Sequence, residues 1–242
     1  MRANVSTSKA LVFGGTGAVG SAVVRGLARA GVPTVFTYHR SIDKACALAA
    51  EHSQRAVGVE LTDSDAVRRL IADLDRDGAP NIFVHCAATS GALELDSISD
   101  DAWHTVQLVN VQSAFVACQE LGRRMAKNHD GGGHMVLVGA IDRGQSIPLP
   151  VHFAASQGAL GAMTMALGKQ LGPRGICVNM VALGLLEGGL SRAISPKLVA
   201  DYTTFSALRR LGTPEEAARA ILWLALENTY MNGEVLPVNG GL

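Results

Sequence analysis

Short apolar runs rich in β-branched residues alternate with longer stretches of helical period along this chain, and this alternation restricts its fold more than any other feature. Repeated units of a buried strand and an amphipathic helix form a parallel sheet with helices on both faces. The runs that we interpret as strands are KALVFGG, TVFTYHR, AVGVEL, NIFVHCA, HMVLVGA, ICVNMVA and EVLPVNG. Helices are predicted over 18–30, 42–52, 64–75, 101–127, 153–171 and 214–227. The pattern therefore predicts an α/β fold with a doubly wound parallel sheet of about seven strands.

The chain is expected to form a single domain over 1–242. Its 242 residues are enough for one well-buried core, and no repeat, low-complexity tract or proline-rich linker divides them. The longest stretch without a predicted element is 184–210. In a compact domain a stretch of this length often covers a functional site, so we expect it to act as a lid over the substrate.

Charge limits the classes of partner that this chain can bind. Its 21 basic and 21 acidic residues leave no formal net charge, which disfavours binding to nucleic acid or to an anionic membrane. A small molecule, free or attached to a carrier protein, is the expected substrate. No apolar run is long enough to span a membrane, and a cytoplasmic location is expected. The four cysteines lack the spacing of a metal site, so no metal is predicted.

The first predicted strand ends in a glycine-rich turn, GGTGAVG, directly before a helical pattern. This order of strand, GxGxxG turn and helix is typical of a Rossmann-like dinucleotide site. Glycines permit the tight turn and let the backbone approach a pyrophosphate at the helix start. A plain tight turn is the alternative interpretation. The residues expected to contact the cofactor here are Gly14, Thr16, Gly17, Val19 and Gly20.

The second predicted strand is followed by Arg40 and Ser41, at the place where a carboxylate would bind the adenosine ribose of NAD. A guanidinium matches the geometry of the 2′-phosphate that distinguishes NADP(H). NADP(H) is therefore the expected cofactor, with Arg40 and Ser41 at its phosphate. A solvated surface arginine is the alternative interpretation.

Several segments, taken in order, resemble the short-chain dehydrogenase/reductase family and especially its β-ketoacyl carrier-protein reductases. These segments are FGGTGAVG, HRS, VELTD, LVNVQSAF, GICVNMVALG, RLGTPEEAARAILWLA and GEVLPVNGG, which together extend over essentially the whole chain. The resemblance implies further cofactor contacts at Glu60, Leu61, Ala87 and Gly184, and it matches Asn110 to the helix asparagine of the family's active site.

The same resemblance indicates that the catalytic triad is degenerate. In this family a serine orients the substrate, a tyrosine donates a proton to the carbonyl oxygen, and a lysine four residues later lowers the pKa of the tyrosine. The matching positions here are Ala140, or Gly139 in the neighbouring register, then Phe153 and Gln157. Gln157 is still expected to hydrogen-bond a ribose hydroxyl of the cofactor.

Other polar residues are weaker candidates for a replacement acid. His85 ends the fourth predicted strand, near the expected nicotinamide, and is the best placed of them. The remaining candidates are Asp142, Arg143, His152, Glu187 and Tyr202. Each has a structural alternative as a surface, capping or ion-pairing residue.

Three hypotheses of function remain open. The first is an atypical NADP(H)-dependent ketoreductase that acts on a polyketide- or acyl-type carbonyl. The second is a non-redox enzyme of the same fold, such as a dehydratase, isomerase or cyclase. The third is an inactive subunit that pairs with an active homologue. The resemblance also implies a homodimer or homotetramer, built through the helices at 101–127 and 153–171. Small residues at 114, 117 and 118, and at 159, 162 and 166, would suit close packing between them.

Overall fold

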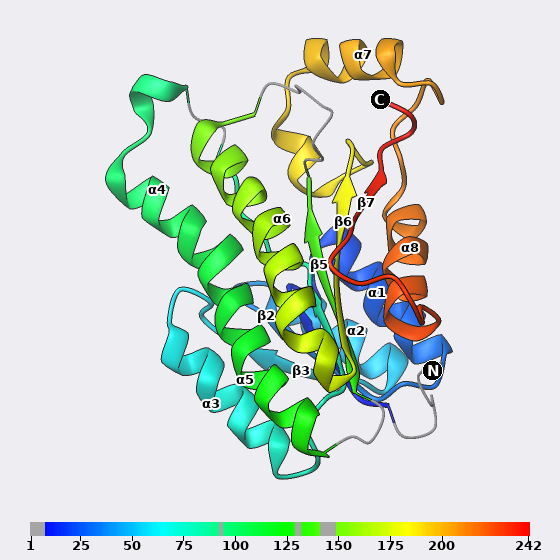
Figure 1. Cartoon of the computed structure of the whole chain (residues 1–242). Coiled ribbons are helices and arrows are strands. Elements are labelled where there is room, and N and C mark those ends of the chain that lie inside the picture. Colours follow the sequence, from blue (N-terminus) through cyan, green and yellow to red (C-terminus); the bar gives the residue numbers. More distant parts are fainter. Residues whose placement is uncertain (1–7, 92–93, 129–131, 141–148) are drawn as a thin grey trace.

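The computed structural model describes residues 8–91, 94–128, 132–140 and 149–242. Within these residues seven parallel strands form one sheet, in the order β3-β2-β1-β4-β5-β6-β7 (Figure 1). The predicted α/β class, the parallel sheet and the number of strands are confirmed. The strand order reverses between β1 and β4, and ligands of doubly wound folds bind beyond the carboxyl ends of the strands at such a point.

The elements follow the predicted alternation. The strands are β1 (Ala10–Phe13), β2 (Thr34–Tyr38), β3 (Arg55–Gly58), β4 (Ile82–His85), β5 (Gly133–Gly139), β6 (Ile176–Leu183) and β7 (Val235–Val238). The α-helices are α1 (Ala18–Arg29), α2 (Ile42–His52), α3 (Ser64–Asp75), α4 (Asp100–Gln107), α5 (Ser113–Asn128), α6 (Val151–Leu171), α7 (Pro196–Phe205) and α8 (Pro214–Leu226). Short 3-10 turns are η2 (Leu95–Ser97), η4 (Gly172–Arg174) and η5 (Gly189–Ala193).

Helices cover both faces of the sheet, because its strands are apolar on both sides. Along β1, Val12 packs in a core with residues of α1, α2 and α8, whereas Leu11 and Phe13 pack in a second core with residues of α3, α5 and α6. Figure 1 shows α1, α2 and α8 on one face and α3, α5 and α6 on the other. Side chains of a strand alternate between faces, so one run of buried residues supplies both cores.

One predicted helix is wrong in detail. The pattern at 101–127 predicts a continuous helix, but the structure has α4, then a π-helical turn η3 (Leu108–Gln112), then α5. Asn110 lies in this turn and is fully buried, and its side chain donates to the Thr89 carbonyl at 3.0 Å and accepts from the Thr89 amide at 2.9 Å. A π-turn often marks a functional site. The hydrophobic period does not reveal it, because the helix continues on both sides.

The stretch at 184–210 is ordered around η5 and α7. Figure 1 shows α7 across the end of the sheet toward which the strands point. Tyr202 of α7 is buried and donates its phenolic hydrogen to the Asn239 carbonyl at 2.6 Å. The Glu187 amide donates to the Gly212 carbonyl at 2.8 Å. The first bond ties α7 to the backbone near the carboxyl terminus, and the second joins the start of the segment to the residues just after its end. Among the described residues, no helix is long and apolar enough to cross a bilayer.

The turn between β1 and α1 depends on the absence of side chains. A Cβ atom on Gly20 would lie 2.1 Å from the Gly14 carbonyl oxygen, and one on Gly14 would lie 2.8 Å from the Ala87 backbone nitrogen. Gly14 also has a φ of +73°, which residues with a Cβ rarely adopt. The first turn of α1 is therefore held directly against the ends of β1 and β4.

We predict that Gly20→Ala lowers the free energy of unfolding by about 3 kcal/mol, because the new methyl group displaces backbone rather than a flexible side chain. Gly158→Ala is the matched control, since a Cβ at this exposed position of α6 meets no atom within 4 Å. The control should raise stability by up to about 1 kcal/mol through helix propensity. Urea unfolding of both variants tests this prediction, and equal stabilities would contradict it.

Candidate functional site

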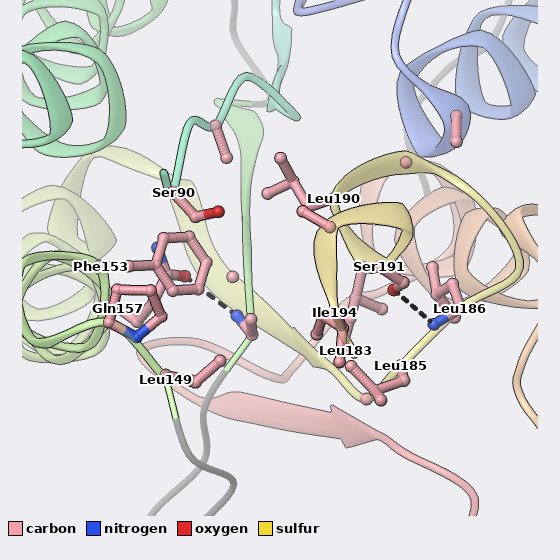
Figure 2. A pocket seen from close by; sticks show the side chains of 18 of the residues that line it. Ser90, Leu149, Phe153, Gln157, Leu183, Leu185, Leu186, Leu190, Ser191 and Ile194 are labelled. Carbon is pink, nitrogen blue, oxygen red and sulfur yellow. Dashed lines mark hydrogen bonds between the residues drawn. The ribbon is translucent and has the colours of Figure 1, made fainter. Parts of the chain in front are cut away.

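A cavity of about 680 Å³ opens at the carboxyl ends of the strands (Figure 2). Its wall comes from the turn before α1, the ends of β4, β5 and β6, the start of α6, and the segment that contains η5 and α7. Of the predicted cofactor contacts, the residues that line it are Gly17, Val19, Gly20, Gln157 and Gly184. Gly184 has no room for a side chain, since a Cβ there would lie 2.0 Å from the Tyr202 hydroxyl oxygen.

The start of α1 presents free backbone donors to this cavity. Gly17 precedes the helix, and no side chain caps the amide groups of its first turn. The turn itself is tied to β2, since the Gly14 amide donates to Thr37 Oγ1 at 3.1 Å and the Gly15 amide to the Thr37 carbonyl at 2.9 Å. An uncapped helix start with a rigid glycine turn is suited to bind a pyrophosphate.

Charged residues gather beyond the ends of β2 and β3. His39 pairs with Glu60 at 3.0 Å, and Arg40 is exposed beside them. Hydrogen bonds from the backbone and side chain of Thr62 lower the pKa of the Glu60 carboxyl, and the charges of His39 and Arg40 lower it further. The ionised Glu60 carboxylate therefore pairs with His39 and accepts hydrogen bonds from Thr62. Ser41 is exposed, whereas Leu61 is half-buried and packs against the core beside α3.

Lys44, which belongs to no motif in the sequence, also lies near this region. Its ammonium group donates to the Thr16 carbonyl in the glycine-rich turn. Lys44 lies in the first turn of α2, four residues after Arg40. Its position in the sequence indicates only that Lys44 lies near the end of β2. Its contact with the turn before α1 depends on the tertiary fold.

The three expected triad positions lie together in the cavity wall. Ala140, Phe153 and Gln157 all line it, and Figure 2 shows Phe153 and Gln157 on the same side. None of these three side chains can donate a proton as a general acid at neutral pH. Gln157, which is expected to hydrogen-bond a ribose hydroxyl, is only 2% exposed, and each end of its amide makes one hydrogen bond within the protein.

A buried polar network holds Gln157 in place. Its Oε1 accepts from the Ala140 amide at 3.0 Å, and its Nε2 donates to Ser156 Oγ at 3.1 Å. Ser156 Oγ also accepts from Asn110 Nδ2 at 2.9 Å and donates to the Phe153 carbonyl at 2.7 Å. The network joins the π-turn, α6 and the end of β5, so it holds three sides of the site together.

The structure corrects the proposal of His85 as an acid. His85 is fully buried, its Nε2 lies 2.9 Å from Ser113 Oγ, and its ring packs against Phe13 and Phe83. Burial lowers its pKa to about 4. It does not line the cavity. A neutral histidine in the core cannot deliver a proton to a ligand there.

The other candidate acids that the structure describes are also not placed to donate a proton to a ligand in the cavity. His152 is 1% exposed and outside the cavity lining, and Tyr202 is bonded to Asn239. Glu187 is exposed and is absent from the described lining. Asp142 and Arg143 lie outside the described residues. Within the described ranges, no group of three or more His, Cys, Asp and Glu side chains could hold a metal ion.

Comparisons with known proteins identify the family. A family model described as enoyl-(acyl carrier protein) reductase matches residues 15–242. The 3-oxoacyl-[acyl-carrier-protein] reductase FabG of Aquifex aeolicus is 30% identical over 241 residues, with 96% of each chain covered. The chain belongs to the short-chain dehydrogenase/reductase family.

Two further relatives illustrate the range of this family. The cyclic-di-GMP-binding biofilm dispersal mediator protein of Escherichia coli is 30% identical over 233 residues, which cover 95% of this chain and 94% of the relative. A short chain dehydrogenase of Burkholderia cenocepacia, solved in complex with NADP, is 28% identical and covers 97% of both chains with a TM-score of 0.88. The predicted family is thus confirmed, and carrier-protein reductases are among its relatives.

The small residues on the two long helices of this family member play different parts. Those of α5 (Ala114, Ala117 and Cys118) are fully buried and belong to the core, so they are not available to a second subunit. On α6, Ala162 and Ala166 are exposed. The sequence pattern alone could not separate these cases, since both helices carry small residues three positions apart and burial depends on the fold.

Stability should depend on pH through His85. Its pKa is about 6.5 in an unfolded chain and about 4 in the fold, so the unfolded state binds the proton more readily. Stability contributed by the neutral ring is fully present above about pH 6.5 and is lost as the pH falls toward 4. From about pH 7 to about pH 5 we expect a loss of about 2 kcal/mol from this residue.

His85→Asn does not titrate in this range and serves as the comparison. Denaturant unfolding at several pH values should show that the wild type loses about 2 kcal/mol more of its free energy of unfolding than the variant between about pH 7 and about pH 5. The same pH dependence of this free energy in both proteins would contradict the burial of a neutral His85.

Proposed function

We propose that this protein binds NADP(H) and acts as an atypical ketoreductase on a polyketide- or acyl-type carbonyl, without the usual tyrosine and lysine. The observation that carries the proposal is that the uncapped start of α1 and the positions Ala140, Phe153 and Gln157 line one cavity. A solved relative in complex with NADP and a FabG carrier-protein reductase among the relatives support it.

The residues present fit a dinucleotide. The turn before α1 is a cradle that a Cβ on Gly20 would fill, and the amide groups of the first turn are free for a pyrophosphate. Arg40 and Lys44 would hold the 2′-phosphate from the side of β2 and α2, since both are exposed cations near the turn. When bound, the reduced nicotinamide supplies a hydride to a carbonyl carbon.

The chain's own residues contribute to the reaction by positioning the reactants rather than by transferring a proton. Phe153 occupies the place of the expected tyrosine, and Gln157 ties α6 to the end of β5. General acid catalysis contributes about 10²- to 10⁴-fold in rate. Orientation of the reactants is a separate contribution, which remains when the general acid is lost. A slow reductase that takes its proton from water or from the substrate is consistent with this arrangement.

An alternative class is favoured by one observation, the absence of an acid at all three triad positions. It includes a non-redox enzyme (a dehydratase, isomerase or cyclase) and an inactive subunit paired with an active homologue. The exposed face of α6 around Ala162 and Ala166 supports association of subunits, as a homodimer, homotetramer or hetero-oligomer.

We further propose that 184–210 acts as the substrate lid, since residues from this segment form one wall of the cavity.

The cofactor is tested by calorimetric titration with NADPH and NADH. Arg40→Ala should weaken NADPH binding at least about tenfold and NADH binding by less than about twofold, because the lost charge-assisted bond involves only the 2′-phosphate. Arg55→Ala is the control, since this exposed arginine begins β3 and pairs with the start of β2, at the end of the strands opposite to Arg40. Equal losses for both nucleotides would refute the role of Arg40.

The lost triad is tested by restoration. The triple variant Ala140→Ser, Phe153→Tyr and Gln157→Lys should raise NADPH oxidation with a simple β-ketoester by about 10²-fold or more, because it returns a proton donor to the cavity. Phe153→Tyr alone should give a smaller gain, since no ammonium then lowers the pKa of the tyrosine. A folded triple variant that binds NADPH without any gain would show that the rest of the pocket does not support reduction.

A further inference from the structure

The cavity wall is strongly apolar around the place where a substrate would lie. Its aliphatic residues include Leu95, Leu149, Leu185, Leu190, Ile194 and Leu198. Among the described lining residues there is no Lys, Arg or His, and the only charged one is Glu94, which is exposed. A substrate carboxylate placed among these aliphatic residues, away from the helix start at Gly17, would lose its water without gaining a cationic partner, which is costly.

Most polar side chains in the wall are already bonded within the protein. Ser191 Oγ accepts from the Leu186 amide at 3.2 Å, and Ser195 Oγ accepts from the Leu198 amide at 3.3 Å. The amide of Gln157 is used at both ends. The Cys86 thiol is a weak donor, and burial raises its pKa to about 12.

Ser90 differs from these residues. It lines the cavity, is half-buried, and makes no side-chain hydrogen bond with any residue in the described ranges. Figure 2 shows its hydroxyl directed into the cavity, on the same side as Phe153. It follows Thr89, whose backbone is held at both polar atoms by Asn110. The neighbouring backbone is therefore fixed, and the hydroxyl has a donor and lone pairs available to a ligand.

We infer that the cavity takes an uncharged, apolar ketone whose carbonyl oxygen accepts a hydrogen bond from Ser90. This inference rests on the proposed function, because it describes the substrate of the same site. The position of Ser90 lets it act from the β4 side of the cavity, while Phe153 offers an aromatic surface on the α6 side. The expected triad serine and tyrosine would each supply a hydroxyl to the carbonyl oxygen. Ser90 supplies one hydroxyl, which orients the carbonyl group.

The chemistry requires only that Ser90 donate a hydrogen bond. A bound reduced nicotinamide would supply a hydride to the carbonyl carbon, and the electron pair of the C=O bond would move to the oxygen. The Ser90 hydroxyl keeps its proton and stabilises the developing alkoxide. Water then protonates the alkoxide, which yields the alcohol and a hydroxide ion. This division agrees with a site that orients a carbonyl but lacks a strong acid.

The substrate class is tested with a matched pair of ketones. One is a cyclohexanone that carries an ethyl ester, and the other is the same ring with the free carboxylate. Calorimetry with the full chain, with and without NADPH, should show that the ester binds at least about tenfold more tightly than the carboxylate. Equal or tighter binding of the carboxylate would overturn an uncharged substrate.

The role of Ser90 is tested with Ser90→Ala and Ser90→Thr. Loss of the hydroxyl should weaken ester binding about threefold to tenfold, whereas Ser90→Thr should retain it because the hydroxyl remains. Infrared spectra of the ester, isotope-labelled at the ketone carbon, should show a higher C=O stretching frequency in Ser90→Ala than in the wild type or Ser90→Thr. A merely structural serine would not move this frequency selectively, and equal frequencies in all three proteins would overturn the inference.

Failure of the inference and failure of the proposed function give different results. Intact NADPH binding without any ester binding to the wild type would overturn the inference alone. Ester binding with the Ser90-dependent frequency, but without NADPH binding, would support Ser90 and overturn the proposed reductase.

Discussion

The close backbone contact between Gly14, Gly20 and Ala87 determines how the site is built. The absence of side chains lets the first turn of α1 rest on the ends of β1 and β4. The amide groups of that turn are left without a cap and lie at the cavity. A wider turn would move α1 away from the point where the strand order reverses.

Asn110, Ser156 and Gln157 form the second constraint. All three are buried, and together they join the π-turn to α6 and to the end of β5. A neutral amide at position 157 can be fully satisfied by neutral partners, whereas a buried ammonium would require stronger compensation. Gln157, at the position where the resembled reductases would carry their lysine, therefore holds α6 against the end of β5. This gives the cavity a rigid wall but no acid.

The apolar character of the cavity follows from the segment that covers it. Leucine and isoleucine side chains from η5 and α7 enclose the space, and Tyr202 fastens α7 to the backbone before the carboxyl terminus. The polar groups that η5 and α7 bring to the cavity, Ser191 and Ser195, are mostly occupied in holding their own turns. Apolar side chains and a small number of polar groups thus line this surface, which is the usual character of sites for small apolar molecules.

The alternation of apolar and helical segments was sufficient to predict the parallel sheet, because buried strands and amphipathic helices pack in few ways. The glycine pattern likewise located the turn before α1. Sequence alone could not reveal that His85 is buried in the core, that Gln157 is bonded at both ends, or that Lys44 reaches the turn. Residue type and spacing determine which elements form, because those preferences are local. Burial and partners depend on segments far apart in the chain, so only the tertiary structure decided which polar groups serve the fold and which, like Ser90, make no side-chain hydrogen bond with the described residues.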